Sequence, residues 1–355
     1  MITILRAWYQ RHFSNPQVVI LALLLVIGFA VVLFAGRILA PILASVIIAY
    51  LLEGAVQVLE RRGMPRIASV TLVFVVFLAA FILSMLGLMP VLSQQITQLV
   101  RELPTMIAEG QKQLLLLPER YPQFVSEEQV REVMGAIRAE VTALGQKVVT
   151  LSLASLVRLV TFLVYLVVIP LMVFFLLKDK DQIVAWVQSF LPSDRGLANE
   201  VWAEVNVKIG SYVRGKFMEI LIVWVTSYVT FALLGLEYAM LLSFTVGISV
   251  IIPYIGAAVV TLPVAAVAYF QWGLDGNFVY VLIAYGVIQF LDGNVLVPLL
   301  FSEVVNLHPV AIITAVLVFG GLWGLWGVFF AIPLATLIQA VIKSWPRYGA
   351  APASG

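Results

Sequence analysis

The sequence predicts an all-α, polytopic membrane protein, and three observations support this fold class. Hydrophobic residues make up 62% of the 355 positions and charged residues only 11%, with a mean hydropathy of +1.06. The apolar residues form runs of about 20, the length of a helix that crosses the hydrocarbon core of a bilayer. Glycine and proline interrupt two of the longest runs. We therefore expect about eight transmembrane helices, two long segments broken by glycine and proline, and an amphipathic helical hairpin outside the membrane.

The composition also argues against several classes of function. The formal net charge is +2 and dispersed, so it does not favour binding to nucleic acid. The chain has no cysteine, which excludes disulfides, thiolate metal sites and cysteine nucleophiles. There is no HExxH pattern and only two histidines, so an intramembrane enzyme would have to build its catalytic site on His308. We expect no enzymatic activity, no metal and no cofactor.

Five membrane spans precede the C-terminal part of the chain. The first follows basic residues but is longer than the core of a signal peptide and lacks a clear cleavage site, so we predict an uncleaved span. The lysines and arginines outside these spans fall mainly on one side, which the positive-inside rule assigns to the cytoplasm. The predicted spans are 18–35, 38–59, 67–90, 149–177 and 217–236.

These spans divide the sequence into five parts. Lys343 and Arg347 place the C-terminus in the cytoplasm with the N-terminus, so the number of crossings is even. Eight crossings result if both long C-terminal segments cross once, and six if both re-enter as hairpins; we favour eight. The predicted parts are 1–90 with spans one to three, 91–147 as an extracytoplasmic insertion, 148–236 with spans four and five around a cytoplasmic linker at 178–214, 237–343 as the transport core, and 344–355 as a disordered cytoplasmic tail.

The insertion at 91–147 is predicted to form two amphipathic helices. Apolar residues recur at intervals of three and four on both sides of PERYPQ, at 118–123, which separates the helices. Such a hairpin packs on itself or on the membrane surface, or it supplies contacts between subunits through a seam like that of a coiled coil.

Two C-terminal segments, 239–270 and 309–342, are each over 30 residues long. A straight helix of that length measures on the order of 50 Å, so each segment must tilt or break, and its glycines and prolines favour a break. Paired segments of this kind around a charged one indicate the binding site of a secondary transporter. The second segment's glycines either admit another helix closely or unwind the backbone along the path. The interrupting residues are Pro253, Gly256, Pro263, Gly320, Gly321, Gly324, Gly327 and Pro333.

One carboxylic acid, Asp292, lies near the middle of the apolar stretch 285–309. An acid at that depth costs roughly 2.5–3.5 kcal/mol on insertion scales, so the fold must compensate for it. Tyr285 and Gln289 precede it at helical spacing and share its face. Asp292 therefore binds a proton, a cation or a substrate hydroxyl, or it only bonds to a neighbouring helix. The residues that loosen the backbone just beyond it are Gly293, Asn294 and Pro298.

Three other titratable residues lie in or beside predicted spans. Arg158 in the fourth span is the natural counter-charge for Asp292, unless its side chain extends to the membrane surface. His308 precedes Pro309 and either titrates in proton coupling or serves as a hydrogen-bonding spacer. Glu53 lies near the cytoplasmic end of the second span, where we expect it to be solvated.

The stretch GSYVRGKF, at 210–217, is similar to a phosphate-binding loop. Phe217 replaces the Ser or Thr that would hold magnesium, and no strand precedes the stretch, so we reject nucleotide binding. Arg214 and Lys216 are instead predicted to anchor the chain at the cytoplasmic interface.

Three motifs in order resemble the autoinducer-2 exporter family of permeases, and most closely its PerM-like branch. The motifs are PYIG at 253–256, DGNVLVPLLFSEVVNLHP at 292–309 and GGLWGLWGVFFAIPLA at 320–335, with YVRGK at 212–216 and LKD at 177–179 as further matches. Many relatives have Glu where this chain has Asp292, and Gln where it has Lys216. The family's motif positions fall here on Pro253, Gly256, Asp292, Asn294, Pro298, His308 and Pro309.

The resemblance covers essentially the whole chain and implies a function. It implies an inner-membrane homo-oligomer, a pentamer, that exports a small molecule such as autoinducer-2 and is coupled to protons or sodium. The expected partners are the lipid bilayer, the solute and the coupling ion. Two other hypotheses are a sodium or other cation/proton antiporter, which the resemblance also implies, and a membrane scaffold or regulatory protein. Deleting 95–145 separates the last, because a scaffold would lose its function and a transporter would keep its central site.

Overall fold

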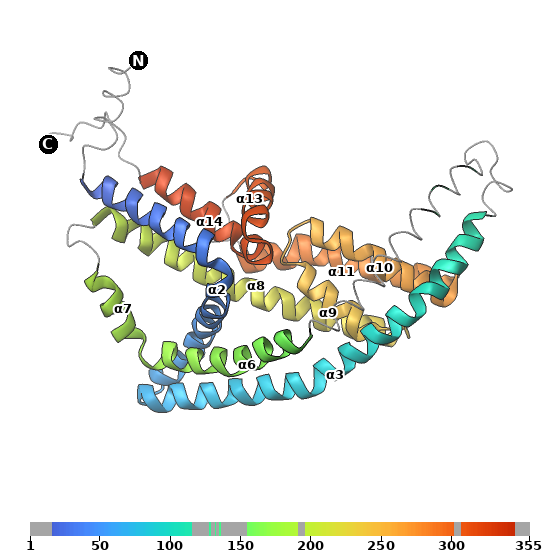
Figure 1. Ribbon diagram of the computed structural model, residues 1–355, viewed down its shortest axis with the longest axis horizontal. Coiled ribbons are helices and arrows are strands. Elements are labelled where there is room, and N and C mark those ends of the chain that lie inside the picture. The colour runs from blue at the N-terminus through green and yellow to red at the C-terminus, as the bar shows by residue number, and fades with distance from the viewer. Residues whose placement is uncertain are drawn as a thin grey trace, which may run out of the picture.

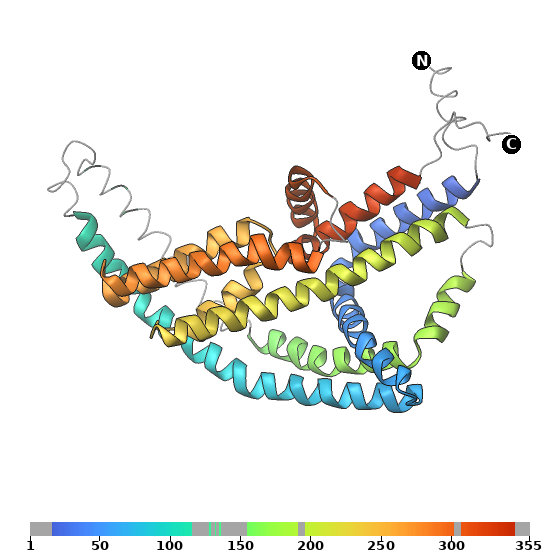
Figure 2. The same cartoon turned by 180° about the vertical axis from the view of Figure 1, so that it is seen from behind.

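The computed structural model describes residues 16–115, 155–190, 196–301 and 307–344, together with the single residues 128, 132 and 135. Every regular element within this part of the chain is helical, which confirms the predicted all-α class. Figures 1 and 2 show an elongated arrangement in which α3, α6 and α8 run lengthwise. Six of the described helices are long and apolar enough to cross a membrane, and shorter apolar helices accompany them.

The N-terminal helices are longer than the predicted spans. α2 (Pro16–Arg61) contains both of the first two spans without ending between them. α3 (Arg66–Leu115) contains the third span and continues through Pro90 and Pro104 into the first half of the predicted outer hairpin. The helix does not end at residue 90, because a proline removes only one internal hydrogen bond and the flanking residues continue the helix. The second half of the predicted hairpin lies almost entirely outside the described residues.

The middle of the chain forms α6 (Ser155–Lys178), α7 (Lys180–Ser189) and α8 (Gly196–Leu233). α6 packs against α2 and α3 through a buried cluster that includes Val56, Val70 and Val173. α8 contacts α2, α9, α11 and α14 and so connects the two halves of the molecule. One face of the middle of α8 is therefore buried, including Tyr212, Lys216 and Glu219, whereas Phe217 and Met218 on the other face are exposed.

Both long C-terminal segments are broken, as the sequence predicts. The first consists of α9 (Ala239–Ser249) and α10 (Ile255–Trp272), and the second of α13 (Pro309–Trp323) and α14 (Leu325–Ser344). Between them lie α11 (Gly276–Leu291), the π-helical turn η1 (Asp292–Leu296) and α12 (Val297–Phe301). The two arms of each broken segment contact each other, so each segment is a helical hairpin.

The turns of the two hairpins share three features, although the first turn is five residues long and the second is one residue long. A residue with positive φ precedes the second arm in each, Tyr254 at 63° and Gly324 at 60°. Pro263 follows Tyr254 by nine positions, and Pro333 follows Gly324 by the same nine. Early in each second arm a glycine lies against the end of the first arm, where a Cβ would come within 1.8 Å of a backbone carbonyl oxygen. Glycine is therefore required at both crossings.

Candidate functional site

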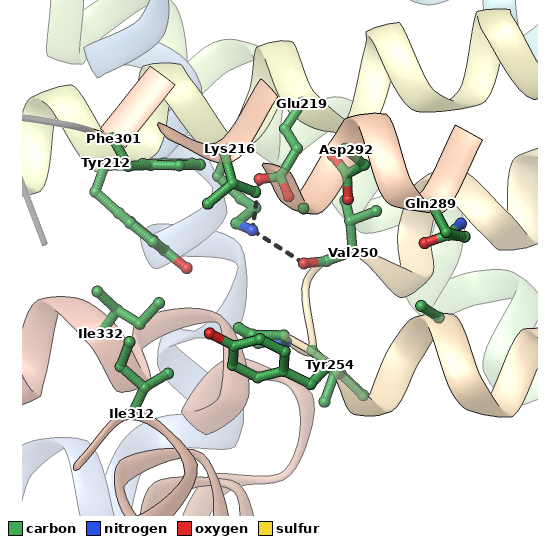
Figure 3. A pocket seen from close by; sticks show the side chains of 15 residues that line it. Tyr212, Lys216, Glu219, Val250, Tyr254, Gln289, Asp292, Phe301, Ile312 and Ile332 are labelled. Carbon is green, nitrogen blue, oxygen red and sulfur yellow. Dashed lines mark hydrogen bonds and ion pairs between the residues drawn. The ribbon is translucent and has the colours of Figure 1, made fainter. Parts of the chain in front are cut away.

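The break between α9 and α10 opens onto a cavity of about 350 Å³. Figure 3 shows its lining, in which charged and amide side chains lie on one side and aliphatic side chains on the other. The charged and amide side chains come from α8, α11 and η1, and the apolar ones from the α9–α10 break, α10, α12, α13 and α14. The labelled lining residues are Tyr212, Lys216, Glu219, Val250, Tyr254, Gln289, Asp292, Phe301, Ile312 and Ile332.

Lys216 and Glu219 form an ion pair one turn apart on α8, with Lys216 Nζ 2.6 Å from Glu219 Oε2. The ammonium group also donates a hydrogen bond to the carbonyl oxygen of Val250, 2.9 Å away, just beyond α9. The two side chains are only 4% and 3% exposed. Removing one partner of such a pair leaves an uncompensated buried charge at a cost of about 3–5 kcal/mol, so each partner depends on the other.

Asp292 begins η1, where the helix widens between α11 and α12. The N–H of Val297 donates to the carbonyl oxygen of Asp292, five residues earlier, which is the hydrogen bond of a π turn. Single π turns within α-helices are frequent at functional sites. Oδ1 of Asp292 and Nε2 of Gln289 are buried, and neither has a hydrogen-bond partner in the described part of the chain. An acceptor and a donor thus lie one helical turn apart, ready for a ligand.

The charged groups of the cavity act as one cluster. Asp292 is close enough to interact electrostatically with both Lys216 and Glu219. Two carboxyl groups face a single ammonium, so the ionised cluster has a net negative charge that attracts cations and hydrogen-bond donors and repels anions. The described residues contain no group of three or more His, Asp or Glu side chains that would suit a metal ion.

Two buried tyrosines fix the hairpins around the cavity. Tyr285 on α11 donates a hydrogen bond to the carbonyl oxygen of Ala257 on α10, 2.8 Å away. Tyr212 on α8 donates one to the carbonyl oxygen of Phe329 on α14, 3.1 Å away. Phe329 lies four residues before Pro333, whose missing N–H leaves that carbonyl free. The central helices α8 and α11 therefore hold one arm of each hairpin.

The structure brings several predicted site residues together. Asp292, Gln289 and Pro253 line the cavity. Tyr285 and Gly256 lie directly behind the lining, because Tyr285 bonds to Ala257 and Gly256 lies against the end of α9.

Other predicted site residues lie elsewhere. Asn294 and Pro298 are exposed, and Asn294 Nδ2 donates to the carbonyl oxygen of Phe290. His308 is exposed and caps α13, where its Nδ1 accepts the N–H of Val310 and Pro309 is the first helical residue. The Arg158 side chain lies outside the described residues, so the predicted pairing with Asp292 stays a prediction; the cation in the cavity with Asp292 is Lys216.

The glycines of the second hairpin are absent from the cavity lining. Gly327 lies against the carbonyl oxygen of Phe319, Gly320 faces the side chain of Val328, and Gly324 forms the turn. A Cβ on Gly321 would meet nothing within 4 Å. Three of these glycines therefore shape the hairpin, and the second segment reaches the cavity only through Ile312 and Ile332. Pro263 and Pro333 lie inside α10 and α14.

The prediction that Lys216 anchors the chain at the membrane interface is wrong. Only 3% of Lys216 is exposed, since the face of α8 that carries it packs against the α9–α10 break. Sequence reasoning missed Glu219, which lines the cavity and pairs with Lys216. A signal was available, because Glu219 lies in the predicted fifth span and a basic residue precedes it by one helical turn.

Comparison with known proteins places the chain in a family. A family model described as "AI-2E family transporter" matches residues 21–347. "Putative permease PerM" of Escherichia coli K12 is 47% identical over 346 residues, which cover 98% of each chain. "Putative transport protein YrrI" of Bacillus subtilis is 26% identical over 308 residues, 86% of each chain. The chain belongs to the AI-2E transporter family.

Membership of the AI-2E family fits the architecture described above. Its relatives are named as permeases or transport proteins, so the chain is a multi-pass membrane transporter and not an enzyme. In this family member the Lys216–Glu219–Asp292 cluster lies beside the discontinuous α9–α10 segment.

Proposed function

We propose that this AI-2E family protein is a secondary transporter of the inner membrane that exports a small polar solute similar to autoinducer-2. The supporting observation is the cavity at the α9–α10 break, which holds three interacting charged side chains inside an apolar helical protein. Ionisable groups in membrane helices cost several kcal/mol, and proteins mostly retain them along substrate or ion pathways.

The lining residues have different tasks in this proposal. Asp292 accepts hydrogen bonds from hydroxyl groups of the solute, and Gln289 donates one, because both have unpartnered buried atoms on one helix face. Phe301, Ile312 and Ile332 cover the carbon skeleton. The α9–α10 break provides the movable backbone, since the cavity wall at residues 250–254 is not helical.

Transport by reconstituted protein tests this function. Vesicles that contain the purified chain are loaded with autoinducer-2, and its efflux is measured for wild type, Asp292→Asn and Asp275→Asn. We expect Asp292→Asn to slow efflux by about tenfold or more, since a hydrogen bond to a charged group contributes about 1.5–3 kcal/mol. Asp275 is a matched control, because it lies exposed at the other end of α11. Equal efflux for Asp292→Asn and wild type would remove Asp292 from the mechanism.

A cation/proton antiporter is the second candidate, and the charge balance of the cavity favours it. Two carboxyl groups face one ammonium, so the site has room for one more positive charge. A pH-sensitive dye inside the same vesicles would report proton movement after a pulse of sodium chloride. Proton movement that depends on Asp292, without autoinducer-2 efflux, would favour the antiporter over the exporter.

We also propose that both termini are cytoplasmic and that the chain assembles into pentamers. The distribution of lysine and arginine supports the orientation, and the family resemblance supports the assembly. Native mass spectrometry would detect a pentamer as a species of five times 39.1 kDa. A cysteine introduced at either terminus is unique in this cysteine-free chain, so its reaction with an impermeant thiol reagent would report its side of the membrane.

A further inference from the structure

The ammonium group of Lys216 has an unusual setting for a lysine. Its polar partners among the described residues are a carboxylate oxygen of Glu219 at 2.6 Å and the carbonyl oxygen of Val250 at 2.9 Å. A second carboxylate, that of Asp292, interacts with it across the cavity. The ring of Phe301 lies 5.2 Å away, within the range of a cation–π contact. Carboxylates, a carbonyl and an aromatic face form a site that favours a cation whether or not a lysine supplies it.

The end of α9 strengthens this preference. The last carbonyl groups of a helix lack internal partners and carry a partial negative charge. α9 ends at Ser249, and the next carbonyl oxygen, that of Val250, points to the Lys216 ammonium. In discontinuous helices of transporters, such carbonyl groups coordinate small monovalent cations. Here, too, a carbonyl group at a helix end binds a cation, but the cation is the ammonium group of Lys216 on α8.

No other residue of the cavity lining can replace the positive charge of Lys216. The groups that line the cavity around Lys216 are the hydroxyls of Tyr212 and Tyr254, the two carboxyl groups, the amide of Gln289 and aliphatic or aromatic carbon. Lys216 is the one cation among the residues that line the cavity. Without it, two carboxyl groups would face the end of a helix in an apolar environment.

We propose that Lys216 is a tethered cation that permanently fills a monovalent-cation site formed by Glu219, Asp292 and the Val250 carbonyl. The wild-type protein then needs no dissolved ion at this place. Removing the lysine side chain opens the site to a free cation of ammonium or sodium size. This proposal does not depend on which neutral solute the protein exports. It differs from the antiporter candidate, in which a free cation binds to the same cluster in wild type.

Thermal unfolding of the purified full chain in detergent tests this inference. The Tm of wild type, Lys216→Ala and Lys208→Ala is measured at constant ionic strength in choline chloride and then in lithium, sodium, potassium, ammonium and methylammonium chloride. Lys208 is a matched control, because it pairs with Glu204 at 2.8 Å on the same helix but is 26% exposed.

Only Lys216→Ala should respond to the identity of the cation. We expect its Tm to fall in choline chloride, and ammonium, methylammonium or sodium to restore at least half of the loss with a saturable concentration dependence. Wild type and Lys208→Ala should unfold at the same temperature in all these salts. A Tm of Lys216→Ala that is equally low in every salt would overturn the proposal, as would a matching response of wild type.

A second variant covers the case in which Lys216→Ala does not fold. Lys216→Met combined with Glu219→Gln removes one positive and one negative charge, so the net charge of the cluster is the same as in wild type. No free cation is then needed to replace the Lys216 ammonium group. We expect this double variant to be recovered at a higher yield than Lys216→Met alone and to show no response to the cation. A double variant that is no better recovered, or that still responds, would overturn the proposal.

Discussion

At the scale of single residues, the carbonyl of Phe329 shows how the fold repairs a backbone defect. Pro333 has no N–H to offer this carbonyl, and Tyr212 supplies the hydrogen bond from α8 at 3.1 Å. Tyr212 is 1% exposed, so water cannot take its place. The proline, the carbonyl and the tyrosine therefore form one unit that joins α14 to α8.

Tyr212→Phe should destabilise the protein by about 1–3 kcal/mol, because it leaves the Phe329 carbonyl buried and unpaired. In a Pro333→Ala background the same change should cost less, since alanine restores the N–H that α14 lacks. Unfolding by sodium dodecyl sulfate, followed for both single variants and the double variant, gives the coupling free energy. Additive effects would show that Tyr212 and Pro333 act separately.

At the scale of elements, the two hairpins depend on a glycine where their arms cross. A Cβ on Gly256 would lie 1.8 Å from the carbonyl oxygen of Ser249, and one on Gly327 would lie 1.8 Å from that of Phe319. Both obstructing atoms belong to the backbone, so no side chain can move aside. Each crossing therefore excludes a methyl group.

Gly256→Ala and Gly327→Ala should each lower the free energy of unfolding by about 1–3 kcal/mol or more, the usual cost of overpacking. Gly286→Ala is the matched control, because this glycine lies inside α11 with nothing within 4 Å of an added Cβ. It should be neutral or stabilising by up to about 1 kcal/mol. Equal effects at the three positions, measured by the same unfolding assay, would contradict the close approach.

At the scale of the whole molecule, charged side chains that are mostly shielded from solvent gather at two places in the described part of the chain. One is the cavity, and the other is the end of the molecule where α2, α3 and α7 meet. There Glu53 pairs with Lys180 at 2.9 Å and with Arg66 at 3.6 Å, and its side chain is 13% exposed. The expectation that Glu53 is solvated is wrong, because two cations from neighbouring helices enclose it. Lys180 and Arg66 are themselves partly exposed, so this cluster is open to salt, whereas the Lys216–Glu219 pair, with side chains 4% and 3% exposed, is buried.

The two clusters should respond differently to ionic strength. Glu53→Gln and Glu219→Gln should both lower the Tm, since each leaves cations without their partner. The loss for Glu53→Gln should shrink in about 1 M salt, where the screening length falls to about 3 Å, whereas the loss for Glu219→Gln should persist. Melting curves of both variants at low and high sodium chloride would check this. A salt-sensitive loss at Glu219 would mean that water reaches the cavity cluster freely.

The sequence predicts the architecture better than the site. Hydropathy is a local property, so the helical class and the positions of the two breaks follow from runs of apolar residues and from glycine and proline. Asp292 is identifiable because it stands alone in an apolar stretch. Lys216 is different, because its place near the end of a predicted span fits an interfacial anchor equally well. The distinction depends on which face of α8 meets the α9–α10 break, and that is decided by contacts between segments far apart in the chain.

The turns of the two hairpins each contain a residue with positive φ, but they differ in backbone strain. Gly324 adopts its positive φ without steric cost, whereas Tyr254 holds a similar φ against its own Cβ, a conformation that costs on the order of 1–3 kcal/mol. The turn of the first hairpin is therefore strained, and that of the second is not. Any rearrangement that returned Tyr254 to negative φ would release this energy, whereas Gly324 has no comparable strain to release.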